Sequence, residues 1–95
     1  MRAKKRLEFT ARAFGHIAAA EEYIATDNPS AAQKVVELIY KTAEKLELFP
    51  EMGKPGRVPG TRELPLKQYH YTIVYRIKAA RIIVYAVLHQ SRRYP

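Results

Sequence analysis

The stretch YTIVYRIKAARIIVYAVLH, residues 71–89, carries the strongest structural signal in the chain. Its first half, 71–78, alternates between two sets of side chains with a period of two, which predicts a β-strand. Its second half, 81–89, is almost continuously apolar, as expected of a strand that is buried on both faces and central in a sheet. Ala79 and Ala80 between them predict a turn, although they are not the Gly or Asn typical of tight hairpins.

The residues before this hairpin predict one more strand and a long loop. Leu64 and Leu66 share one face of a strand over 62–68, again with a period of two. Upstream of it, Pro and Gly residues predict a loop without regular structure between 49 and 60. These residues are Pro50, Gly53, Pro55, Gly56, Pro59 and Gly60.

Two helices precede the loop. Apolar side chains at helical spacing predict the first helix over 11–26, with Thr10 as its N-cap. The second helix is predicted over 29–48, where Asn28 suits the cap and Pro29 the first helical position. Because the connection is so short, we expect the helices to pack as an antiparallel hairpin.

The chain begins with a short segment, 5–10, that predicts an edge strand with Leu7 and Phe9 on one face. The predicted order of elements is therefore β-α-α-β-β-β. Three sequential strands after a helical hairpin predict an α+β fold of two layers, with the hairpin packed on an antiparallel sheet. A length of 95 residues suits a single domain, 1–95.

Positive charge is concentrated in the part of the chain predicted to form the sheet. Residues 54–95 contain nine Lys or Arg and one acid, Glu63, whereas residues 1–53 contain eight basic and eight acidic residues. The whole net charge of +8 therefore arises after residue 53. A folded surface of one sign predicts an anionic partner, either nucleic acid, an acidic protein or both.

Composition argues against several classes of protein. Without cysteine the chain has no disulfide, thiolate metal site or cysteine nucleophile, which fits a reducing cytoplasm. The three His residues are not at metal-ligand spacing, and neither a glycine-rich phosphate loop nor a serine-nucleophile motif is present, so no metal or cofactor is expected. No apolar run predicts a membrane span, and no secretory signal is expected.

Basic and polar residues near the predicted strand ends form the candidate site: Arg57, Arg62, Arg76, His89, Arg92, Arg93 and Tyr94. Guanidinium groups bind phosphate through paired hydrogen bonds, and histidine can transfer a proton near neutral pH. Such a group is able to cleave RNA without a metal, by driving the 2′-hydroxyl onto the adjacent phosphate. The alternative is that the arginines are solvated surface, and that Arg62 buries its stem and pairs its head with an acidic residue of a helix.

An ordered set of short motifs over residues 8–95 resembles the RelE/ParE superfamily of toxins, of the kind called plasmid stabilisation proteins. The motifs are Tyr23-Ile24-Ala25, Asn28-Pro29, Ala31-Ala32, Phe49-Pro50, Met52-Gly53, Gly56-Arg57, Gly60-Thr61-Arg62-Glu63-Leu64, Tyr71-Thr72-Ile73-Val74-Tyr75-Arg76, Val87-Leu88-His89 and Arg92-Arg93. The resemblance implies a cytoplasmic toxin of a type II toxin–antitoxin system. Its partner would be a partly disordered antitoxin that wraps the toxin in a hetero-oligomer.

The two branches of this superfamily act differently. ParE-like members bind DNA gyrase and trap it with broken DNA, whereas RelE-like members cut messenger RNA in the ribosome. RelE-like nucleases tend to carry an arginine where this chain has Thr72, which favours the ParE-like side. The resemblance then implies a gyrase inhibitor without a reaction of its own, with His89, Arg92, Arg93 and Tyr94 as target-binding residues.

Two alternatives remain open. A ribosome-dependent, metal-independent endoribonuclease would use Arg62 and Arg92 to hold the phosphate and His89 to transfer a proton, because Arg92 falls near the position of a second catalytic arginine in those nucleases. A degenerate toxin would only bind its antitoxin or regulate its operon.

Overall fold

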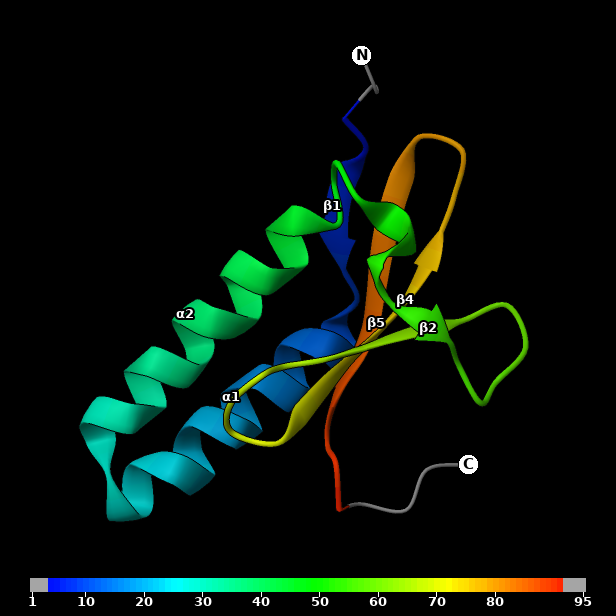
Figure 1. Cartoon of the computed structure of the whole chain (residues 1–95). Coiled ribbons are helices and arrows are strands. Elements are labelled where there is room, and N and C mark those ends of the chain that lie inside the picture. Colours follow the sequence, from blue (N-terminus) through cyan, green and yellow to red (C-terminus); the bar gives the residue numbers. More distant parts are fainter. Residues whose placement is uncertain (1–3, 92–95) are drawn as a thin grey trace.

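The computed structural model describes residues 4–91 and confirms the α+β fold with two helices before the main strands. Its elements are β1 (Arg6–Phe9), α1 (Ala11–Asp27), α2 (Pro29–Lys45), the 3₁₀-helix η1 (Pro50–Met52), β2 (Lys54–Pro55), β3 (Arg62–Pro65), β4 (Tyr71–Ile77) and β5 (Arg81–His89). Figure 1 shows α1 and α2 as a hairpin on one side of the sheet. None of the helices in residues 4–91 is long and apolar enough to span a membrane.

The strands form one sheet in the order β1-β5-β4-β3-β2. The strands β3, β4 and β5 pair antiparallel as predicted, β2 pairs antiparallel with β3, and β5 lies inside the sheet between β4 and β1. The edge strand β1 departs from the predicted pattern, since it pairs with β5 in parallel. A parallel pair needs a long crossover connection, and the helical hairpin is part of the chain that joins these two strands.

The prediction of a loop without regular structure between 49 and 60 was wrong in detail. This segment contains η1 and the two-residue strand β2, which pairs with β3. Proline is compatible with both elements, because Pro50 occupies the first position of η1 and Pro55 lies on the edge strand of the sheet.

Both predicted helix caps are confirmed. The side-chain oxygens of Thr10 and Asn28 each accept a hydrogen bond, at 3.1 Å, from the backbone N–H three residues later. The second helix ends at Lys45 rather than at residue 48, because the chain continues there as a hydrogen-bonded turn.

The two faces of the sheet have different roles. The face toward the helices forms the main core, in which Ile39, Tyr75 and Ile82 are fully buried. The opposite face carries a second, small apolar cluster of Val74, Ala86 and Leu88. We call this opposite side of the sheet the helix-free face.

A β-bulge at Tyr85 sets the direction of the last residues of β5. Tyr75 pairs with Val84 and Val74 pairs with Ala86, so Tyr85 is the extra residue of the bulge. Val84 and Val87 consequently both belong to the main core although they are three residues apart. The bulge thereby fixes the alternation of side chains as far as the end of the strand.

Candidate functional site

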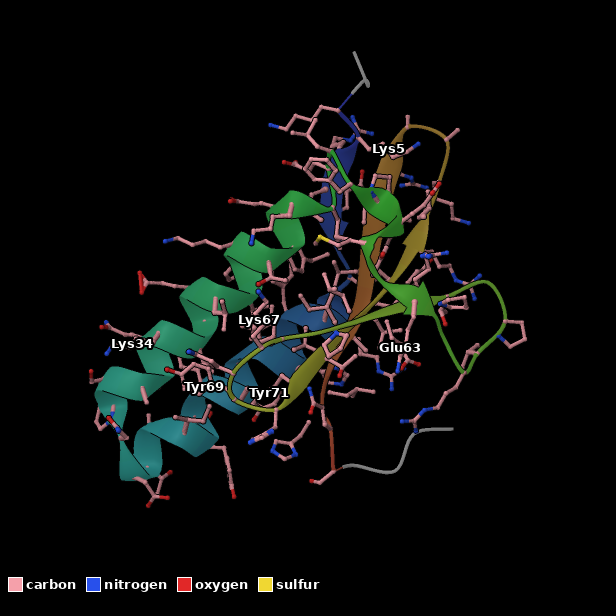
Figure 2. The ribbon with its side chains drawn as sticks, in the orientation of Figure 1. Lys5, Lys34, Glu63, Lys67, Tyr69 and Tyr71 are labelled. Carbon is pink, nitrogen blue, oxygen red and sulfur yellow. The ribbon has the colours of Figure 1, made fainter. Side chains whose placement is uncertain are left out.

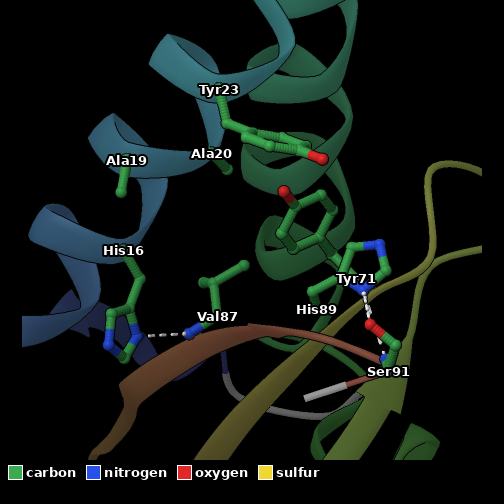
Figure 3. Close-up of a pocket in the computed structure, with 8 residues that line it drawn as sticks. All are labelled: His16, Ala19, Ala20, Tyr23, Tyr71, Val87, His89 and Ser91. Atoms are coloured by element: carbon green, nitrogen blue, oxygen red, sulfur yellow. Dashed lines mark hydrogen bonds between the residues drawn. The ribbon is translucent and has the colours of Figure 1, made fainter.

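His89 lies in a cleft between α1 and the end of β5 (Figure 3). The cleft has a volume of about 540 Å³ and is lined by His16, Ala19, Ala20, Tyr23, Tyr71, Val87, His89 and Ser91. Small alanine side chains on α1 leave this space open, and the exposed Tyr23 forms its rim. The cleft therefore adjoins the point where the predicted target-binding tail begins.

The His89 ring is held by short-range contacts. Its Nδ1 accepts the backbone N–H of Ser91 at 3.2 Å and lies 2.7 Å from the Ser91 hydroxyl oxygen. The ring also packs edge-on against Tyr71, with a centroid separation of 5.1 Å. Because Nδ1 accepts an N–H, the neutral ring carries its proton on Nε2. These contacts orient His89 as part of a turn that leads into the tail.

A strained turn supports the same region. Tyr69 and His70, between β3 and β4, both adopt a positive φ, which is uncommon for non-glycine residues and costs roughly 1–3 kcal/mol each. The carbonyl of His70 accepts the backbone N–H of Gln90 at 2.7 Å, and the Gln90 side chain donates to the carbonyl of Tyr71 at 3.2 Å. The turn thus anchors the base of the tail, and it contains no glycine or asparagine by which the sequence would reveal it.

His16, on α1, binds the backbone of β5 at the edge of that strand. It was not among the predicted site residues. Its Nδ1 accepts the backbone N–H of Val87 at 3.1 Å. The paired part of β1 ends at Phe9, opposite Val84, so Val87 lies beyond the strand that covers this edge. A side chain from α1 therefore satisfies a donor that the neighbouring strand does not reach.

Arg62 is engaged by the backbone of the preceding loop. Its Nε and one of its Nη atoms donate to the carbonyl of Gly53 at 3.0 and 2.5 Å, and the same Nη donates to the carbonyl of Glu51 at 3.3 Å. The guanidinium thus holds η1 and β2 against β3. The acceptors are loop carbonyls, so Arg62 has a structural role as expected, but the expectation that a helix acid would pair with it was wrong.

The loop is also held by two buried polar side chains. The Tyr75 hydroxyl donates to the carbonyl of Pro50 at 2.6 Å and accepts the N–H of Gly53 at 2.9 Å. Figure 2 shows Glu63 beside the loop from β2 to β3, where its carboxylate accepts the N–H of Arg57 at 3.0 Å. These bonds make the loop an ordered part of the molecule.

Of the predicted nuclease residues, the structure describes Arg62 and His89, and it does not bring these two together. Arg62 pairs with Tyr75 and His89 pairs with Tyr71, which are four residues apart along β4. At about 3.3 Å per residue, this places the two backbone positions roughly 13 Å apart along the strand direction alone. The other predicted site residues, Arg92, Arg93 and Tyr94, lie outside the described residues.

The helix-free face presents a second hollow of about 190 Å³. It is lined by Arg12, Val58, Thr61, Val74, Arg76, Tyr85, Ala86 and Leu88. Arg76 lies with its Cζ 5.6 Å from the centroid of the Tyr85 ring, at a distance suited to a cation–π contact. Within residues 4–91, no set of three or more His, Asp or Glu side chains is placed to hold a metal ion.

Comparison with known proteins identifies the family. The sequence model of the family described as "ParE toxin of type II toxin-antitoxin system, parDE" matches residues 7–94. A candidate toxin of Sinorhizobium fredii, Y4kP, is 36% identical over 92 residues, which cover 97% of this chain and 95% of that protein.

Solved structures share the fold. A structure of the chromosomal ParDE TA system from P. aeruginosa superposes with a TM-score of 0.83, at 24% identity over 90% of this chain and 96% of that one. The toxin–antitoxin complex RelBE2 from Mycobacterium tuberculosis gives a TM-score of 0.61, at 21% identity over 97% and 98% of the two chains. From the extent of the family match and of the S. fredii alignment, this chain belongs to the ParE toxin family of type II toxin–antitoxin systems.

Proposed function

We propose that this protein is the toxin of a type II toxin–antitoxin pair and that it acts by binding DNA gyrase, without a reaction of its own. The observation that carries the proposal is the separation of Arg62 from His89, two of the three residues that a nuclease would use. Arg62 donates to loop carbonyls, and His89 lies at the other end of β4 in the cleft beside α1. In addition, this chain has Thr72 where RelE-like nucleases tend to carry an arginine.

The partner that keeps the toxin inactive is an antitoxin, in a hetero-oligomer. Two solved relatives of the same fold come from a ParDE system and from a RelBE2 toxin–antitoxin complex. The net charge of +8 suits an acidic partner, because opposite charges accelerate association and select the correct surface.

The C-terminal tail is the part that we propose to bind the target. His89, Arg92, Arg93 and Tyr94 are adjacent in sequence, and the strained turn and Gln90 fix the place where the tail leaves the sheet. Two consecutive arginines supply guanidinium groups for a carboxylate or phosphate of the gyrase–DNA complex.

The deciding experiment is a gyrase supercoiling assay with purified, folded protein, with and without ATP, scored for cleaved linear plasmid. We expect loss of supercoiling or accumulation of cleaved DNA. The variant with Arg92→Ala and Arg93→Ala should lose this effect and its toxicity in cells while it keeps its thermal unfolding midpoint. The control variant with Lys34→Ala and Lys41→Ala loses the same charge on exposed positions of α2 and should remain active.

Two results would overturn the proposal. One is unaffected gyrase at a large excess of folded protein, and the other is full toxicity of the tail variant. Cleavage of translated messages at codon-defined positions, reduced by about 10²–10⁴-fold on replacement of His89, would instead establish an endoribonuclease.

A further inference from the structure

Arg76 has an unusual environment for an arginine in the middle of a sheet. Its side chain is half-buried, and its guanidinium lies against the Tyr85 ring on one side. A Cβ atom on Gly60 would lie 2.5 Å from Arg76 Nη1, so the missing side chain of this glycine, at φ +85°, leaves room for the guanidinium. Packing against Tyr85 and Gly60 therefore holds the planar group in place.

The donors of this guanidinium are not used within the described part of the chain. Neither a hydrogen-bond acceptor nor an ion-pair partner contacts the Arg76 side chain among residues 4–91. An arginine presents five N–H donors in a fixed fork that fits the two oxygens of a carboxylate. A fork that is held in place and still has free donors loses little conformational entropy when it binds an anion.

The surroundings of Arg76 add positive charge. Arg12, from the first turn of α1, lines the same hollow, whereas none of its lining residues is acidic. The nearby Glu63 carboxylate accepts the N–H of Arg57 and lines a different hollow. The hollow is therefore suited to an anionic group.

The floor of the hollow indicates what must accompany the anion. Val74, Ala86 and Leu88 are buried aliphatic residues without groups that read the edges of nucleotide bases. The one aromatic ring, Tyr85, lies under the Arg76 guanidinium, so a base has no free ring face there on which to stack. An aliphatic side chain beside a carboxylate fits this surface better than a nucleotide.

We propose that the hollow on the helix-free face binds an acidic residue and an adjoining aliphatic side chain of a partner polypeptide, with Arg76 and Arg12 holding the carboxylate. This site is on a different part of the molecule from the tail, and its occupation does not depend on gyrase as the target. The gyrase proposal and this one can therefore fail separately.

The test is NMR titration of the ¹⁵N-labelled full chain with the peptide acetyl-Leu-Glu-Leu-Glu-Leu-amide. The matched probes are the same peptide with Gln in place of Glu and a hexauridylate RNA. We expect saturable shifts of the Arg76 Nε–H signal and of the Tyr85 and Ala86 amides with the acidic peptide, and at most about one-tenth of the affinity with the neutral peptide.

Variants assign the effect to the two arginines. Arg76→Gln should weaken binding of the acidic peptide by about tenfold, and Arg76→Lys by less, because lysine keeps the charge and loses the planar fork. Arg12→Gln changes an exposed residue, so it tests the site even if Arg76→Gln fails to fold. Arg81→Gln removes the same charge at the start of β5 and should change the affinity by less than about twofold.

Three results would overturn the proposal. They are equal binding of the acidic and neutral peptides, unchanged binding by Arg12→Gln and by folded Arg76→Gln, and shifts that map to the His89 cleft instead of the hollow. Tighter binding of hexauridylate at Arg76 would also overturn it and would make this face a nucleic-acid surface.

Discussion

Arg62 and Arg76 lie on neighbouring strands, and the difference between their surroundings separates two regions of this toxin. In the loop region, residues 49–63, the side chains of Arg62 and Glu63 form hydrogen bonds with the loop backbone, and so does the hydroxyl of Tyr75 from β4. On the helix-free face, Arg76 packs against an aromatic ring and keeps its donors available. The positive charge of a basic protein is therefore a poor guide to function until the acceptors of each arginine are known.

Removing the Tyr75 hydroxyl should give the largest change in stability. Tyr75→Phe leaves the carbonyl of Pro50 and the N–H of Gly53 without their buried partner, which costs about 1–3 kcal/mol in the free energy of unfolding. Urea denaturation measures it. Tyr85→Phe is the control on the helix-free face and should cost less than about 0.5 kcal/mol. Equal losses of stability in the two variants would contradict the proposed difference between the loop region and the helix-free face.

The next largest difference in stability should be between variants of the two arginines, Arg62 and Arg76. Arg62→Gln loses its hydrogen bonds to the carbonyls of Gly53 and Glu51 and should destabilise the protein by about 1–2 kcal/mol. Arg76→Gln loses a cation–π contact and no hydrogen bond in the described structure, so a loss nearer 0.5 kcal/mol is expected. Thermal and urea unfolding of the two variants measure these losses. A larger loss of stability for Arg76→Gln than for Arg62→Gln would contradict the structural role given to Arg62.

An effect smaller than that of Arg62→Gln should come from the edge of β5. His16→Leu removes the acceptor of the Val87 N–H and should cost about 0.5–1 kcal/mol, because water in the open cleft replaces part of the lost bond. Hydrogen exchange of the Val87 amide measures the change at the site itself. An unchanged exchange rate would mean that the imidazole does not protect this donor.

Much of the fold could be predicted from the sequence, because local patterns and the final structure agree. The period of two over β4 and the caps at Thr10 and Asn28 needed no knowledge of tertiary contacts. The bulge at Tyr85 was not predictable in this way, since a strand that is apolar on both faces gives no sign of a change in alternation.

The site was predicted less well, because its properties depend on contacts between distant segments. The sequence placed Arg62 and His89 in one candidate nuclease group, yet loop carbonyls bind the first and the α1 cleft holds the second. The approach of Gly60 to Arg76 joins two residues 16 positions apart, and no motif signals it. Only the positions of these groups in space show which of them remain available.

Because of the bulge at Tyr85, the number of residues in β5, rather than their type, determines which face of the sheet the last side chains of this strand point to. Successive strand residues point to opposite faces, so deleting one residue at the bulge would exchange the sides of all that follow. His89 would then leave the cleft beside α1 and turn toward the face that carries Arg76. Loss of the ring contact between His89 and Tyr71 would report that exchange, and a single-codon deletion would thereby move the start of the tail to the other side of the toxin.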